Sequence, residues 1–126
     1  MTDHIDPGPQ AAALCAFIDE RKFQEDLPFY PGAIDEPSRL RLQAGIDDLA
    51  TRLLPLADRP LDKAAVLDEF RQTMGEIDRG ESEDVERCAG YMEALMDIFG
   101  IESSDGLLND WVYGFDPNEL KRQDQH

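Results

Sequence analysis

Hydrophobic residues recur at helical spacing along most of the chain, and no stretch alternates long enough to predict a β-strand. The strongest pattern lies between Ser82 and Phe99, where apolar residues follow one another at intervals of three or one along a single face. Ser82 precedes two acidic residues, as is typical of a helix start, and Gly100 follows the last apolar residue. The pattern predicts a helix over 82–99.

Three further patterns predict helices upstream of this one. We expect a first helix from Pro9 to about Glu25, because proline suits the first helical turn. Asp35 is placed to cap a second helix that runs to Leu54, and Asp62 to cap a third over about 62–77. Between the first two helices, the proline-rich segment 26–37 is predicted to be a loop that packs on the core through its apolar residues.

The segment after Gly100 combines turn residues with the only tryptophan of the chain. Ser103–Asp105 supplies candidate caps for a short helix over Gly106–Tyr113. Trp111 falls on the apolar side of that helix, whereas Tyr113 is expected at the surface. The chain of 126 residues therefore predicts one all-α domain over 9–122, a compact bundle of four main helices plus the short C-terminal helix. A flexible arm, 1–8, and a polar tail, 123–126, are expected to flank it.

Two blocks of the sequence, FYPGAID (Phe29–Asp35) and YMEALMDIFGIESSDGLLNDWVYGF (Tyr91–Phe115), resemble a family of small bacterial proteins known only as a domain of unknown function. The likeness extends over most of residues 10–116. This resemblance implies a compact, mainly helical domain, and it implies no activity.

The charge of the chain is strongly negative and unevenly distributed. Its net charge is −16, and the segment Glu76–Glu119 holds 13 of the 28 acidic residues but only two of the 12 basic ones. Such a charge repels nucleic acids and anionic membranes, and it suits a basic protein partner or a cationic ligand. The N-terminus has no basic region followed by an apolar run, so we expect a cytoplasmic protein.

The residues that most catalytic sites use are scarce. The two histidines, His4 and His126, lie near the ends of the chain, so no histidine base is available inside the domain. Cys15 and Cys88 fall within predicted helices, where we expect both thiols to be buried. No cysteine-rich zinc spacing, phosphate-binding loop or standard calcium loop is present. The sequence predicts no catalytic site, no cofactor and no metal.

The first hypothesis is therefore an acidic, non-catalytic interaction protein, most concretely an inhibitor or immunity protein that masks a basic toxin or another basic protein. The residues predicted to bind the partner are acids on and before the fourth helix and two aromatic anchors: Glu81, Glu83, Asp84, Glu86, Glu93, Asp97, Tyr30 and Tyr113. A first alternative is a small-ligand-binding or regulatory domain with a pocket between the Phe29–Tyr30 loop and the Trp111 helix. A second is an enzyme that uses carboxylates, with or without a metal. The oligomeric state stays open.

Overall fold

The computed structural model describes residues 8–27, 30–77 and 82–114, and within them the chain is all-α. The predicted tail, nearly all of the predicted arm and Glu81 lie outside the described residues. Five α-helices and a short 3-10 turn follow one another: α1 (Pro9–Asp19), α2 (Glu36–Leu53), η1 (Leu54–Leu56), α3 (Lys63–Glu76), α4 (Ser82–Phe99) and α5 (Leu107–Val112).

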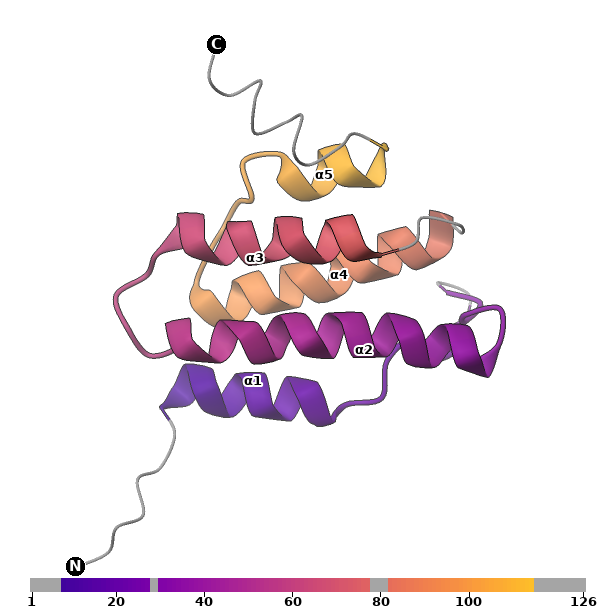
Figure 1. Ribbon diagram of the computed structural model, residues 1–126, viewed down its shortest axis with the longest axis horizontal. Coiled ribbons are helices and arrows are strands. Elements are labelled where there is room, and N and C mark those ends of the chain that lie inside the picture. Colours follow the sequence, from indigo (N-terminus) through magenta and orange to yellow (C-terminus); the bar gives the residue numbers. More distant parts are fainter. Residues whose placement is uncertain (1–7, 28–29, 78–81, 115–126) are drawn as a thin grey trace, which may run out of the picture.

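The helices stack with α1 and α5 at opposite ends and with α2, α3 and α4 between them (Figure 1). Buried side chains from all five helices form one core, in which α2 packs against α1, α3 and α4. Each fully buried large apolar side chain contributes about 1.5–3 kcal/mol relative to its exposed state. Within the described ranges, no helix is both long enough and apolar enough to cross a membrane. The predicted all-α bundle is confirmed.

The predicted helix caps at the starts of α2 and α3 are present. The Asp35 carboxylate accepts a hydrogen bond from the Ser38 amide at 2.8 Å, and the Asp62 carboxylate accepts one from the Ala65 amide at 3.1 Å. Each bond satisfies an amide that the first helical turn leaves without an intrahelical partner. These signals are local in sequence, and for that reason the starts of both helices were predictable.

The end of α1 differs from the prediction. The helix stops at Asp19, because Lys22 turns inward and its ammonium group donates to the carbonyl oxygens of Phe17 at 2.5 Å and Glu20 at 2.9 Å. The same nitrogen lies 2.6 Å from a carboxylate oxygen of Asp47 on α2. A buried cation thus satisfies the last carbonyls of α1 and ties the helix to α2.

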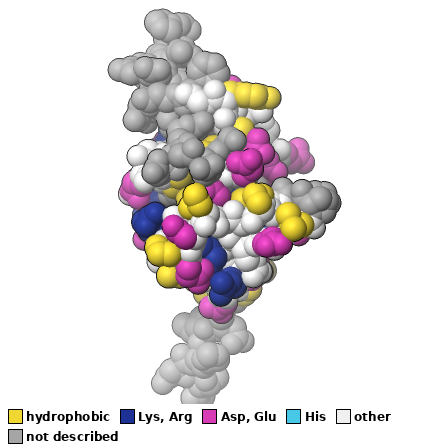
Figure 2. Space-filling model, turned by 90° about the vertical axis from the view of Figure 1, so that its right-hand side faces the viewer, with side chains coloured by type: hydrophobic (Ala, Val, Ile, Leu, Met, Phe, Trp, Pro, Cys, Tyr) yellow, Lys and Arg dark blue, Asp and Glu magenta, His cyan; other side chains and the backbone are white. Residues whose placement is uncertain are grey.

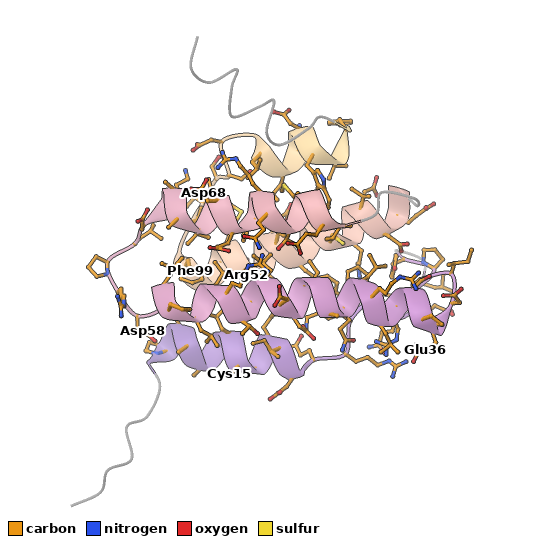
Figure 3. All side chains as sticks on the ribbon, in the orientation of Figure 1. Cys15, Glu36, Arg52, Asp58, Asp68 and Phe99 are labelled. Carbon is orange, nitrogen blue, oxygen red and sulfur yellow. The ribbon has the colours of Figure 1, made fainter. Side chains whose placement is uncertain are left out.

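The start of α1 is capped by a residue from elsewhere in the chain. Its N-cap residue, Gly8, has no side chain, and both oxygens of Asp58 instead accept hydrogen bonds, each at 3.0 Å, from the amides of Gln10 and Ala11. A Cβ atom on Gly8 would lie 2.2 Å from the Asp58 carboxyl carbon, so this contact requires glycine. Figure 3 shows Asp58 beside the beginning of α1.

The two cysteines lie in different environments. Cys88 is buried, and its burial together with the nearby charge of Asp84 raises the pKa of its thiol to about 12. Cys15 is exposed, so the prediction of a buried thiol was wrong at this position. The apolar face of α1 runs through Leu14 and Phe17, and Cys15 points away from it.

The loop over 26–37 packs on the core less completely than predicted. Tyr30 is buried and is fixed by paired backbone hydrogen bonds with Asp26. Leu27 and Ile34 are exposed, although an apolar loop was expected to bury them. Phe29 lies outside the described residues.

Candidate functional site

The outer face of α4 is acidic. Its exposed residues with described side chains are either acids or the small residues Gly90 and Ala94. Residues 83, 86, 90, 93 and 97 are spaced three and four apart, which places them on one side of the helix. The acids of this face are Glu83, Glu86, Glu93 and Asp97. The predicted exposure of these four residues is confirmed.

A sharp turn at the end of α4 brings the following segment back beside this face. The Gly100 amide donates to the Asp97 carbonyl at 3.1 Å, and the Ile101 amide donates to the Met96 carbonyl at 2.9 Å. This pair of bonds defines a Schellman motif, which requires a left-handed residue at Gly100, whose φ is +73°. Ile101 is buried, so the turn is anchored to the core.

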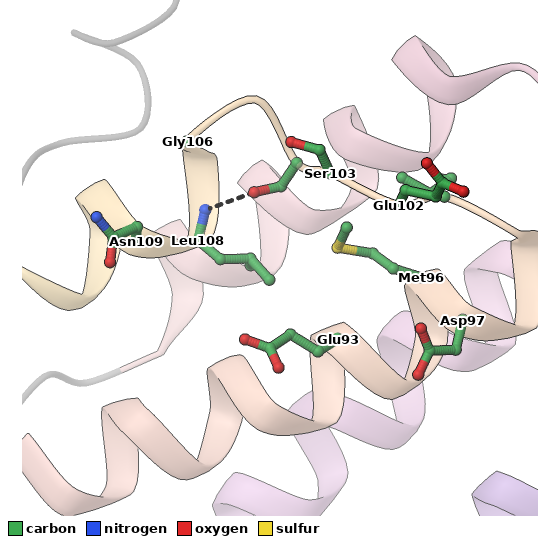
Figure 4. A pocket seen from close by; sticks show the side chains of 10 residues that line it. Glu93, Met96, Asp97, Glu102, Ser103, Gly106, Leu108 and Asn109 are labelled. Atoms are coloured by element: carbon green, nitrogen blue, oxygen red, sulfur yellow. Dashed lines mark hydrogen bonds between the residues drawn. The ribbon is translucent and has the colours of Figure 1, made fainter.

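Serine side chains then shape the start of α5. The Ser103 hydroxyl accepts a hydrogen bond from the Asp105 amide at 3.0 Å, and the Ser104 hydroxyl accepts one from the Leu108 amide at 3.2 Å. The helix begins after Gly106, which adopts a φ of +89°. The expected capping by the segment 103–105 is therefore confirmed for Ser104, and its bond to Leu108 is visible in Figure 4.

Between α4 and α5 these turns leave a groove of about 340 Å³. Met96, Ile101 and Leu108 supply apolar surface to it, and carboxylates flank it in Figure 4. The residues that line it are Glu93, Met96, Asp97, Ile101, Glu102, Ser103, Ser104, Gly106, Leu108 and Asn109. No lysine or arginine is among them.

The three carboxylates of the groove, Glu93, Asp97 and Glu102, form no ion pair with any described residue. They also do not converge: in the part of the chain that the structure describes, no three acidic, histidine or cysteine side chains lie close enough to hold a metal ion. The groove therefore presents separate negative charges around apolar surface. Such an arrangement suits a partner whose positive charges are also separated.

Two predicted partner-binding residues are not on this surface. The Tyr30 hydroxyl donates to a carboxylate oxygen of Asp84 at 2.5 Å, and both side chains are at least nine-tenths buried. Burial and this hydrogen bond raise the pKa of Tyr30 above its ordinary value. The placement of Asp84 on the exposed face of α4 was wrong, because Asp84 lies on the side of that helix that faces the loop, and Tyr30 is too buried to serve as an exposed anchor.

The remaining predictions about the site have mixed outcomes. Tyr113 is 74% exposed, as expected, but it does not line the groove. Glu102 also lines the groove and was not among the predicted residues, because its place there depends on the reversal of the chain at Gly100. Trp111 is buried in the core. It lines neither this groove nor the hollow beside the loop residue Ile34, so neither of these two hollows is the predicted pocket between the loop and the Trp111 helix.

Comparison with known proteins identifies relatives of the whole domain. A family model described as a domain of unknown function (DUF4844) matches residues 5–116. A search of curated proteins found no match. The crystal structure of a DUF3571 family protein from Acinetobacter baumannii AYE is similar, with 30% sequence identity and a TM-score of 0.75 over 90% of this chain and 94% of that chain. These findings confirm the resemblance and the helical fold.

Proposed function

The chain belongs to the DUF4844 family, a family defined by a domain of unknown function, and we propose that it is a non-catalytic protein that binds a basic protein partner through the groove between α4 and α5. The observation that carries the proposal is a set of three carboxylates that form no ion pair with any described residue and surround a small apolar floor, with no lysine or arginine among the described residues that line the groove. An inhibitor or immunity protein that masks a basic toxin is the concrete form of this function.

The chemistry of the groove favours lysine and arginine side chains. Their hydrocarbon stems bury well against apolar side chains such as Met96 and Leu108, while their charged ends stay at a polar rim. Glu93 and Asp97 extend that rim along α4. Opposite charges on the two partners speed association and select against acidic competitors.

The surface continues beyond the groove. Glu86 and Glu83 lie on the same face of α4, which is 18 residues and therefore about 27 Å long. Exposed Gly90 lies between the two pairs of acids, and a Cβ atom added there would meet nothing within 4 Å. A glycine in the middle of a helix costs about 1 kcal/mol relative to alanine, and close approach of a partner's backbone is one use for it.

The proposal is tested with a defined probe, an amphipathic peptide of alternating leucine- and arginine-rich turns, by isothermal titration calorimetry. We expect binding to wild-type protein that weakens as salt is raised, because exposed charges are screened. Replacing the groove charges together, as Glu93→Gln, Asp97→Asn and Glu102→Gln, is expected to weaken binding at least about tenfold, which corresponds to 1.4 kcal/mol.

The matched control removes three charges outside the groove, at the end of α1 and in the segment after it, as Asp19→Asn, Glu20→Gln and Glu25→Gln. Both triple variants change the net charge by the same amount, because each replaces three acids by amides. The control residues are also exposed and form no ion pair with a described residue. If both triple variants weaken the peptide equally, net charge and not the groove determines binding. Binding that does not depend on salt would also contradict the proposal.

The inhibitor form of the function needs a natural partner. Co-purification from the native host at low salt, with wild-type protein and the groove variant side by side, is expected to recover a basic protein with the wild type alone. Loss of that protein's activity on addition of the wild type would then support masking. Recovery of the same protein with both baits would place its binding elsewhere.

A further inference from the structure

Asp84 is the exception among the buried charges of this protein. Within the described ranges, three charged side chains are at least nine-tenths buried: Lys22, Arg39 and Asp84. Lys22 pairs with Asp47 at 2.6 Å, and Arg39 pairs with Glu36 at 2.5 Å. Asp84 forms no ion pair with any residue in the described ranges. Burying an ion without an opposite charge is costly, and Asp84, which is 8% exposed, has only the Tyr30 hydroxyl and its place in the first turn of α4 to offset that cost.

The neighbours of Asp84 satisfy only part of its carboxylate. The Tyr30 hydroxyl donates to Oδ1, while Oδ2 makes no hydrogen bond or ion pair with any residue that the structure describes. The nearby guanidinium of Arg87 is used elsewhere, since it pairs with Asp26 at 3.1 Å and lies 5.0 Å from the centre of the Tyr30 ring. The hydroxyl therefore holds the carboxylate in place without neutralising it.

Asp84 also lines a hollow of about 230 Å³ between the loop and the start of α4. Pro31 and Ile34 supply apolar surface, and Glu83 adds a second carboxylate. Ile34 is 77% exposed, so its side chain is accessible to a ligand in the hollow. Figure 2 faces this end of the molecule and shows hydrophobic and acidic side chains beside one another.

We propose that this hollow binds a guanidinium group, with Oδ2 of Asp84 as its principal acceptor. A guanidinium is planar and more weakly hydrated than an ammonium, so it tolerates contact with Pro31 and Ile34 better. Its N–H groups donate charge-assisted hydrogen bonds to a carboxylate, and the bond becomes stronger where water is excluded. The site is distinct from the groove between α4 and α5 and does not depend on that groove's function.

The probe is methylguanidinium chloride, titrated into the full-length protein and followed by amide chemical shifts. We expect saturable shifts at Gly32 and Asp84, and weaker binding of methylammonium chloride at the same ionic strength. Asp84→Asn keeps an acceptor for Tyr30 but removes the charge, and it is expected to weaken methylguanidinium binding at least about tenfold. Asp19→Asn, an exposed change on α1 outside both the hollow and the groove, is the matched control and is expected to leave binding within about twofold.

A measurement on the wild-type chain keeps the test independent of how Asp84→Asn folds. Nuclear Overhauser effects between the methyl group of methylguanidinium and the side chain of Ile34 are expected when the site is filled. Their absence, equal losses in the two variants, or tighter binding of methylammonium would each overturn the proposal.

The same titration separates two sources of the group. Tighter binding of N-acetyl-arginine methylamide than of methylguanidinium would support an arginine side chain of a protein as the natural ligand. Equal or weaker binding would support a free guanidino compound. Both outcomes require the hollow to be occupied as proposed.

Discussion

Several charges between α1, α2 and α3 pair with one another, whereas three acids beside α4 and α5 form no ion pair with any described residue. Arg52 of α2 donates to Glu69 of α3 at 2.8 Å and to the Thr73 hydroxyl at 2.5 Å, and it also pairs with Asp48. Figure 3 shows Arg52 between α2 and α3. In the groove between α4 and α5, by contrast, no lysine or arginine is among the described residues that line it beside the carboxylates.

The difference follows from where the basic residues are. Only Arg79 and Arg87 lie in the segment Glu76–Glu119, and Arg87 is engaged with Asp26. The acids of this segment outnumber its bases so strongly that internal pairing is impossible for most of them. Carboxylates of the same kind thus form ion pairs between α2 and α3 and form none with described residues in the groove between α4 and α5.

The largest effect is expected from Lys22→Met. The change leaves the carboxylate of Asp47 and the end of α1 without their buried partner, and it is expected to lower the free energy of unfolding by about 3 kcal/mol. Urea denaturation measures this. Lys63→Met is the control, because Lys63 forms a more exposed ion pair with Asp105 and should cost less than about 1 kcal/mol. Equal losses would contradict a structural role specific to Lys22.

A smaller effect is expected from Asp58→Ala, which removes the cap of α1. Both hydrogen bonds to the first turn are lost, at a cost of about 1–2 kcal/mol in the free energy of unfolding. Asp58→Asn keeps one acceptor oxygen and tolerates the left-handed backbone at this position, so it should cost less. A loss as large in Asp58→Asn as in Asp58→Ala would show that charge, and not hydrogen bonding, is what matters there.

The pH dependence at the start of α2 is expected to be smaller still. The hydrogen bonds from Ser38 lower the pKa of Asp35 below its ordinary value of 3.8. A carboxylate with a lowered pKa stabilises the folded state above its unfolded pKa, and that stability is lost as the pH falls through the folded pKa. Urea midpoints measured from neutral pH to below about pH 4 should therefore fall more steeply for wild type than for Asp35→Asn. Parallel curves would contradict this assignment.

The smallest effect is expected for the groove acids, which form no ion pair within the described part of the chain. Neutralising Glu93, Asp97 and Glu102 together should change the free energy of unfolding by no more than about 0.5 kcal/mol, because no ion pair with a described residue is lost. The same urea measurement applies. A loss above about 1 kcal/mol would show that the groove acids support the fold, and the contrast between the two sides would then fail.

Local signals made much of the fold predictable, and distant contacts explain what was not. Asp35, Asp62 and Gly100 end or begin helices through bonds to residues a few positions away, and all three were identified from the sequence. The end of α1 was misplaced because it depends on a contact of Lys22 with α2. Asp58 acts on a helix start 48 residues earlier in the chain, which no local pattern reveals.

The same distinction applies to the candidate site. Helical spacing alone placed Glu93 and Asp97 on the exposed face of α4. Asp84 was assigned wrongly because its partner, Tyr30, is 54 residues away, and its burial depends on how the loop folds back. Glu102 joins the groove only through the reversal of the chain at Gly100, which is a property of three-dimensional structure and not of spacing.

Side chains from outside α1 form hydrogen bonds with both of its ends, and these bonds affect how readily the helix unfolds locally. An isolated helix of 11 residues is marginal in water, and its ends would normally fray first. Here Asp58 holds the first turn and Lys22 holds the last one, so neither end opens without releasing a contact to the rest of the bundle. Amide hydrogens along α1 should consequently exchange with solvent as one cooperative unit, at rates close to those of the central helix α2.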